Sequence, residues 1–172
     1  MTAQTKLSAP QLLEPIDLSL PLDSGDLLIQ VTDPTVFAQA HIDGAVLLPP
    51  AHLCSGIQPA VGKLPDLDSL HAALASIGYH PDRRIIAYDD EGGGWAGKLL
   101  WVLDVIGHKH WAYLNGGLHA WAGAGQPLSH GTFQAQDIAA DFTLNINHQA
   151  IAEIEDVLQA ISDPEQIIWD CL

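Results

Sequence analysis

Short apolar runs alternate with longer segments of helical periodicity over the first 128 residues, and this alternation constrains the fold more than any other feature of the sequence. The short runs are rich in Ile, Leu and Val, which favour strands, and the longer segments repeat apolar residues every three or four positions. Strands are predicted at residues 27–31, 45–48, 83–88 and 111–114, and helices at 34–40, 66–78, 95–107 and 117–124. Such an order predicts a layered α/β domain with a mostly parallel sheet.

Acidic residues mark the starts of two of these helices. Asp33 precedes Pro34, which suits the first position of a helix, and Asp66 precedes the next helical segment. That second helix is expected to turn one apolar face inward, formed by Leu67, Leu70, Leu74 and Ile77.

The composition and the charge exclude several classes of protein. With 48% hydrophobic and 16% charged residues among 172, the chain is too apolar to be disordered, yet it lacks the run of about 20 apolar residues that spans a membrane. The formal net charge is -15 and no Lys or Arg follows Lys109, so nucleic acids and anionic membranes are repelled. We therefore expect a soluble protein with neither a nucleic-acid nor a membrane partner.

The two cysteines, Cys54 and Cys171, allow no disulfide framework, and residues 1–10 lack the features of a signal peptide, so a cytoplasmic location is expected. No basic residue neighbours either cysteine in the sequence, so neither is predicted to be a reactive thiolate. His108 and His110 are predicted to be solvated turn residues. None of the nine histidines forms a ligand spacing with the cysteines, among them His41, His52, His71, His80 and His119. We expect no metal and no cofactor.

The loop Asp89-Asp90-Glu91-Gly92-Gly93-Gly94 follows the clearest strand, where open α/β sheets bind their ligands. Residues 92–98 also match the spacing G-x-x-x-x-G-K of a phosphate-binding P-loop. However, Leu99 stands where Ser or Thr must bind magnesium, and three preceding carboxylates repel phosphate, so ATP binding is not expected. An aspartate-based phosphatase is disfavoured too, because Glu91 and Gly93 occupy the places of its second Asp and its Thr.

Two motifs remain. Residues 37–45 read Phe-Ala-Gln-Ala-His-Ile-Asp-Gly-Ala, and residues 113–121 form an apolar strand, Gly-Gly and a tryptophan one helical turn later. The first resembles the signature of the rhodanese family, an aromatic residue, three residues and His-Ile-Pro-Gly-Ala, with Asp43 in place of the proline, and the second resembles the closing motif of the same family. The motif residues are predicted to have scaffold roles: Phe37, His41, Gly44, Gly116, Gly117 and Trp121.

The resemblance covers about residues 12–128 and is closest to the N-terminal half of the bacterial tandem-domain members, the thiosulfate sulfurtransferases. It implies an open, mostly parallel sheet flanked by helices on both faces. Family members use a cysteine directly after the central strand to take sulfane sulfur from thiosulfate as a persulfide and pass it to a thiophilic acceptor. Asp89 stands at that position, so the resemblance implies a degenerate active-site loop, no catalytic residue in this chain, and inactivity alone.

A weak repeat follows a polar segment at 129–141, which is predicted to be a linker. An apolar segment, a helical segment at 149–160, an acidic turn and an apolar strand at 167–170 repeat the order of residues 11–33. From the pattern alone, a second domain and a β-α-β annex to one domain are equally good interpretations. Taken with the resemblance, the repeat predicts a rhodanese-like domain at 1–128 and the start of a second rhodanese domain at 142–172. The second-domain interpretation predicts that residues from 142 onward add little to the stability of the first domain.

The expected partner is then a catalytic rhodanese domain, with thiosulfate and a thiophilic acceptor as substrates of the intact enzyme. The chain would pack against that domain and help to wall its substrate cleft. The alternative is a stand-alone binding or regulatory module of the same fold, which uses the 89–94 loop to hold a partner.

Overall fold

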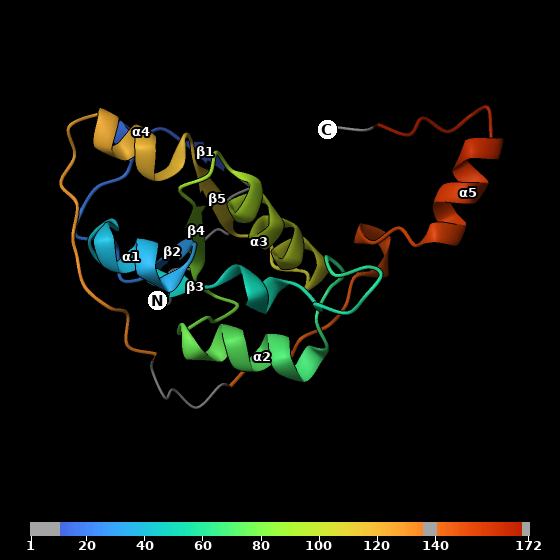
Figure 1. Ribbon diagram of the computed structural model, residues 1–172, viewed down its shortest axis with the longest axis horizontal. Helices are drawn as coiled ribbons and strands as arrows, with labels where there is room; N and C mark the ends of the chain where they lie inside the picture. The colour runs from blue at the N-terminus through green and yellow to red at the C-terminus, as the bar shows by residue number, and fades with distance from the viewer. Residues whose placement is uncertain (1–10, 136–140, 170–172) are drawn as a thin grey trace, which may run out of the picture.

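A central five-stranded sheet organises the protein in the computed structural model, which describes residues 11–135 and 141–169 (Figure 1). The strands are β1 (Gln11–Leu13), β2 (Asp26–Val31), β3 (Val46–Leu48), β4 (Arg84–Tyr88) and β5 (Trp111–Leu114). They lie in the order β1-β5-β4-β2-β3 and every neighbouring pair is parallel. The α/β fold class and the parallel sheet are therefore confirmed.

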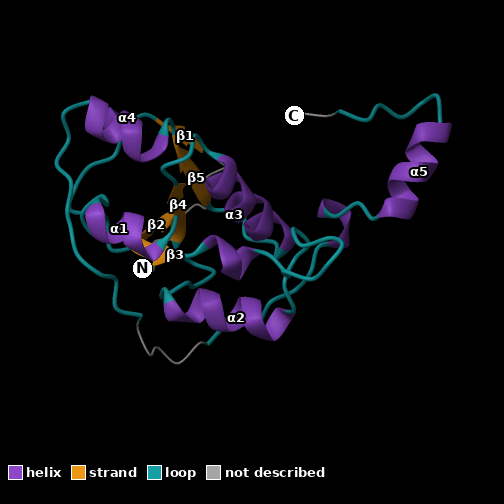
Figure 2. Ribbon diagram, viewed as in Figure 1, coloured by secondary structure: helices purple, strands orange, loops and turns teal. Residues whose placement is uncertain are grey.

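Helices cover both faces of this sheet, as Figure 2 shows. They are α1 (Pro34–Gln39), α2 (Leu67–Ser76), α3 (Gly94–Val105) and α4 (Gly117–Gly123). A further helix, α5 (Ile154–Ser162), does not cover the sheet, and short 3-10 helices occur at Pro15–Asp17, Pro50–Leu53 and His148–Ala150. Both predicted acidic caps are confirmed, because Asp33 accepts a hydrogen bond from Thr35 N and Asp66 accepts one from Ser69 N. The described residues contain no helix that is both long and apolar enough to cross a membrane.

Strand β4 shows how the sheet separates two hydrophobic layers. Ile85 and Ala87 point into the core formed with α2 and α3, whereas Ile86 and Tyr88 point into the core formed with α4. All four side chains are fully buried, since successive residues of a strand face opposite sides and both sides are covered. Strand β4 therefore lies between the two helical layers, and the loop that follows it lies at the carboxyl edge of the sheet.

One residue of the predicted inward face of α2 is misplaced. Leu70 and Leu74 are buried as expected, but Leu67 is 42% exposed. Leu67 is the first residue of the helix, directly after the Asp66 cap.

The segment after the linker packs on the first domain, so its contacts lead us to expect a contribution to stability that the sequence did not predict. Phe142, Leu144 and Ile146 lie against the core of α2 and α3, and the carbonyl of Phe142 accepts a hydrogen bond from His71 Nε2 at 3.0 Å. Asn147 N donates to the carbonyl of Val105 at 2.6 Å. Apolar residues at alternate positions thus bind residues 142–147 to the layer that α2 and α3 form.

Beyond residue 153 the chain leaves the domain, and α5 projects away from it in Figure 1. Its apolar face is exposed, with Ile154 and Ile161 each 67% and Leu158 59% accessible. Residues 167–169 form no strand, although one was predicted at 167–170. No neighbouring strand lies beside them to supply the backbone hydrogen bonds that a strand requires. The predictions for Asp170, Cys171 and residues 1–10 lie outside the described residues.

Candidate functional site

The Asp89 loop connects the carboxyl end of β4 to the start of α3 and curls around a single carboxylate. Asp89 is 1% exposed. Its Oδ1 accepts hydrogen bonds from the backbone N–H groups of Glu91 (3.1 Å) and Gly93 (2.8 Å). Its Oδ2 accepts from the N–H groups of Trp95 (3.0 Å) and Ala96 (2.9 Å), the first turn of α3. Four converging donors at a helix N-terminus make a cradle for one negative charge, and the side chain of Asp89 fills it.

Two glycines allow this loop to lie so close to its neighbours. Gly93 has φ +103°, and a Cβ there would stand 2.7 Å from the hydroxyl oxygen of Tyr113 on β5. Gly117, at the start of α4, has φ +55°, and a Cβ there would overlap the backbone carbonyl of Asp89. That carbonyl accepts a hydrogen bond from Leu118 N at 2.9 Å. Gly117, one of the two glycines of the closing motif predicted to have a scaffold role, therefore helps to position the loop.

The surroundings of the cradle are aromatic and acidic. Burial, together with the negative charge of Asp89, raises the pKa of Tyr113 above its ordinary value. Glu91 accepts a hydrogen bond from the indole Nε1 of Trp95 at 3.1 Å. A cleft of about 320 Å³ opens beside them, and its lining includes Thr32, Asp33, Asp90, Glu91 and Trp95. This cleft offers carboxylates and an indole edge, and it is open to solvent at the carboxyl edge of the sheet.

The loop geometry does not suit a nucleotide phosphate. A P-loop needs free backbone N–H groups and a lysine directed into the loop. Here the N–H groups are taken by Asp89, and the Nζ of Lys98 donates to the carbonyl of Gly62 at 2.7 Å, away from the cradle. Leu99 is fully buried in the core, which leaves no hydroxyl at the magnesium position.

The motif at 37–45 lies at the turn between α1 and β3. His41 Nδ1 bonds to the carbonyl of Phe37 at 2.8 Å, and the two rings stack with centroids 4.1 Å apart. Ile42 N donates to the hydroxyl of Tyr88 at 2.9 Å, which ties this turn to β4. Gly44 has φ +79° at the bend into β3. The motif thus holds a turn and does not contact the cradle.

The closing motif lies between β5 and α4. Gly116 has φ +69° and precedes α4 as its N-cap. Trp121 is 1% exposed and donates through Nε1 to the carbonyl of Pro127 at 2.8 Å, which binds the chain after α4 to the domain. His119 Nε2 bonds to the carbonyl of Asp90 at 2.9 Å and adds one link between α4 and the loop.

The prediction that His108 and His110 are solvated is wrong. They are 5% and 8% exposed, because the turn between α3 and β5 is covered by Tyr79 and the neighbouring core. His108 bonds through Nδ1 to the hydroxyl of Tyr79 at 3.1 Å and through Nε2 to the carbonyl of His110 at 3.0 Å. Burial lowers the pKa of His108 and raises the pKa of Tyr79 to about 12. Within the described residues, no cluster of three or more His, Cys, Asp or Glu side chains could hold a metal.

Sequence reasoning missed one neighbour of Cys54. The folded chain brings Lys98 to the same hollow of about 370 Å³, which Gly62, Glu91, Gly94 and Trp95 also line. Cys54 therefore has a basic neighbour in three dimensions, although none stands near it in the sequence. That it is not a reactive thiolate stays a prediction. The two residues are 44 positions apart, and no local pattern could have found the pair.

Comparison with known proteins identifies relatives of the whole domain. Residues 14–124 match the family model of the rhodanese-like domain. The thiosulfate sulfurtransferase of Pseudomonas aeruginosa is 36% identical over 162 residues, which cover 94% of this chain and 59% of that protein. The thiosulfate sulfurtransferase of Azotobacter vinelandii is 35% identical over 164 residues, covering 95% and 60%. The chain therefore spans about three fifths of the length of these curated relatives.

The fold also matches that of a solved relative. A crystal structure of a 3-mercaptopyruvate sulfotransferase from Escherichia coli aligns with a TM-score of 0.71 at 23% identity, over 87% of this chain and 62% of that one. At this identity the match concerns the arrangement of strands and helices alone.

Proposed function

The chain belongs to the rhodanese-like domain family, with thiosulfate and 3-mercaptopyruvate sulfurtransferases among its relatives, and we propose that it is the non-catalytic N-terminal domain of a tandem sulfurtransferase. In the proposed intact enzyme, a cysteine thiolate of the second domain attacks the sulfane sulfur of thiosulfate. The sulfur–sulfur bond of thiosulfate breaks, sulfite leaves with the bonding electrons, and the cysteine keeps the sulfur as a persulfide. A thiophilic acceptor such as cyanide then takes that sulfur.

The position of Asp89 carries this proposal. A carboxylate can accept the four N–H bonds of the cradle, but it cannot hold sulfur as a persulfide. Because the carboxylate is buried and already fully bonded, it also leaves the cradle no room for a substrate anion. The rhodanese loop is therefore kept here as a structural element.

The C-terminal segment supports a second domain as the partner. The relatives extend well beyond the matched region, and α5 carries apolar side chains that nothing in the described residues covers. We assign residues 1–128 to the rhodanese-like domain, 129–141 to the linker and 142–172 to the start of the second domain. In this assignment the remainder of the second domain buries Ile154, Leu158 and Ile161.

The carboxyl edge of the sheet, beside the Asp89 loop, is proposed to pack against the second domain and to help wall its substrate cleft. Asp90, Glu91 and Trp95 lie at the carboxyl edge of the sheet, where a second domain of the same fold would bring its own loop. A cytoplasmic setting is part of the same proposal, because two cysteines give no disulfide framework of the kind that secreted proteins use.

The experiment is a thiosulfate-to-cyanide assay of the 172-residue chain and its Asp89→Cys variant. The unmodified chain is expected to show no turnover. Asp89→Cys places a thiol in the cradle and should form a persulfide slowly, detected by mass spectrometry as the gain of one sulfur atom. Adding Asp90→Asn and Glu91→Gln should speed this reaction, since nearby carboxylates disfavour a thiolate and repel the thiosulfate dianion.

Cys54→Ser in the same backgrounds is the matched control. If the unmodified chain turns over thiosulfate and Cys54→Ser abolishes it, the nucleophile lies elsewhere and the domain is catalytic. If the triple variant folds but never gains sulfane sulfur, the loop is not a degenerate sulfur cradle and the proposal fails.

A further inference from the structure

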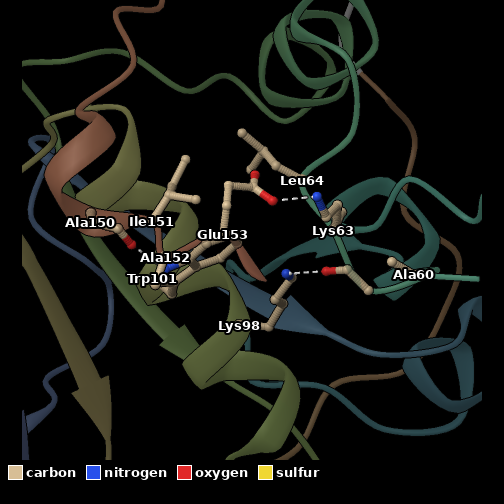
Figure 3. A pocket seen from close by; sticks show the side chains of 10 residues that line it. Ala60, Lys63, Leu64, Lys98, Trp101, Ala150, Ile151, Ala152 and Glu153 are labelled. Carbon is tan, nitrogen blue, oxygen red and sulfur yellow. Dashed lines mark hydrogen bonds and ion pairs between the residues drawn. The ribbon is translucent and has the colours of Figure 1, made fainter. Parts of the chain in front are cut away.

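A cavity of about 600 Å³ lies on the side of α3 that carries Lys98 and Trp101 (Figure 3). One wall is the loop 60–64, the floor is α3, and the other wall is the segment 150–153. No residue of the Asp89 loop lines it. The volume lies within the range of sites that hold small organic ligands, and the proposed sulfur transfer makes no use of it.

The cavity is built by contacts between segments that are far apart in the sequence. Trp101 Nε1 donates to the carbonyl of Ala150 at 2.9 Å and holds one wall to the floor. Lys63 and Glu153 form an ion pair of 2.5 Å that bridges the two walls, as the dashed line in Figure 3 shows. Most of the remaining lining is apolar, namely Ala60, Leu64, Ala150, Ile151 and Ala152.

Lys98 contributes a positive charge to this lining that no carboxylate of the lining pairs with. Its ammonium lies 4.0 Å from the centroid of the Trp101 ring and donates to the carbonyl of Gly62 at 2.7 Å. Within the described residues, three other Lys or Arg side chains pair with carboxylates, namely Lys63, Arg84 and Lys109. Lys98 has no such partner, and burial lowers its pKa. An ammonium with one hydrogen bond to protein has donors left for a ligand anion.

The charges of the lining limit the ligand to a single negative charge. Lys63 and Lys98 contribute two positive charges and Glu153 one negative charge, which leaves one positive charge. A triphosphate or another polyanion would be poorly neutralised there, and the net charge of -15 on the chain repels it further. An organic acid with an apolar body would match both the charge and the apolar surface of the cavity. Its carboxylate or sulfonate would meet an ammonium, and its body would meet Leu64, Trp101 and Ile151.

We propose that this cavity is a binding site for a small organic monoanion, whose acid group bonds to Lys98 Nζ and whose apolar body packs on Trp101, Leu64 and Ile151. The inference stands apart from the sulfurtransferase proposal, because it uses neither the Asp89 loop nor a sulfur-carrying cysteine. Of the residues assigned to the second domain it uses only 150–153, which pack on α3 of the first domain.

The test is a titration of the 172-residue chain with 1-naphthoate, followed through the indole N–H resonances of the tryptophans. The Trp101 resonance, assigned with Trp101→Phe, should shift and saturate, while that of Trp169, outside the cavity, should not. The neutral 1-naphthalenemethanol should bind about 10-fold more weakly, which is a typical effect of losing one charge-assisted hydrogen bond. ATP should bind more weakly than naphthoate.

Variants of the lysine separate its charge from its packing. Lys98→Met should weaken naphthoate binding about 10-fold, and Lys98→Arg should bind within about 3-fold of the unmodified chain. Lys109→Met is the matched control. Lys109 is an exposed lysine that follows the C-terminal end of α3 and pairs with Asp104, so its replacement should leave naphthoate binding unchanged.

Three results would overturn the proposal: equal binding of acid and alcohol, equal binding by Lys98→Met and the unmodified chain, or saturable shifts confined to Trp169. If Lys98→Met does not fold, Ala152→Trp serves instead, since it fills the cavity from the exposed wall and leaves Lys98 in place. It should abolish the Trp101 shift, and an undiminished shift refutes the site.

Discussion

Replacing Asp89 by Ala should destabilise the domain far more than the loss of an ordinary helix cap. The side chain accepts four backbone N–H groups, and two of them, from Trp95 and Ala96, belong to the first turn of α3. Water can reach the N–H groups of Glu91 and Gly93, which lie on the outer part of the loop. Ala96 is fully buried, so the donors of the first turn lose their acceptor without full replacement.

The expected loss follows from these two donors. A hydrogen bond to a charged acceptor contributes about 1.5–3 kcal/mol, so Asp89→Ala should lower the free energy of unfolding by about 3–6 kcal/mol. Removing a solvent-exposed cap costs only about 0.5–2 kcal/mol. Since the total stability of a domain is about 5–15 kcal/mol, the variant should lose a large fraction of it.

The assay is urea unfolding at pH 7, followed by circular dichroism and tryptophan fluorescence. Asp90→Ala is the matched control. The neighbouring Asp90 accepts a bond from His119 through its backbone carbonyl, and its side chain makes no hydrogen bond to the part of the chain that the structure describes, so its loss should change the free energy by no more than about 0.5 kcal/mol. If both variants unfold at the same urea concentration with the same slope, the carboxylate of Asp89 does not organise the loop, and the account of the cradle given above is wrong.

Three further perturbations test the packing around the site. Ending the chain after residue 140 should remove the contacts of Phe142, Leu144 and Ile146 and lower the free energy of unfolding by about 3 kcal/mol. Ending it after Ser162 keeps those contacts and should leave the melting temperature unchanged. Equal melting temperatures for the two truncated chains would show that the segment does not stabilise the domain. Gly117→Ala should cost at least about 2 kcal/mol in chemical unfolding, because its φ is +55° and its Cβ would meet the Asp89 carbonyl, while Gly97→Ala, in an open part of α3, should stabilise by up to about 1 kcal/mol. The lowered pKa of His108 means that the unfolded chain binds a proton first as the pH falls, so its contribution to stability is complete above about pH 6.5 and is lost progressively below it. His108→Gln should flatten that part of the stability profile between pH 7.5 and 5.5, and the exposed His148→Gln should not; an unchanged slope in His108→Gln would assign the effect to other groups.

The sequence alone determined the parts of this protein that depend on neighbours along the chain. Apolar periodicity predicted the strands at 27–31 and 111–114 and the helices that separate them, because the period of a segment reports its local conformation. Asp33 and Asp66 were predicted as helix caps for the same reason, since a cap bonds to N–H groups two or three residues away. The position of Asp89 directly after β4 was likewise predicted from the order of residues.

The tertiary structure decided which surfaces meet. Periodicity shows that a side chain needs cover, but many partners could provide it, so the packing of Phe142 against α2 and the burial of His108 beneath Tyr79 were not predicted. Lys98 shows the difference most clearly. Its spacing from Gly92 suggested a phosphate loop, yet its ammonium lies over Trp101 and bonds to Gly62, 36 residues earlier in the chain. Contacts over such separations are selected by the packing of the whole core, which no local pattern of residues encodes.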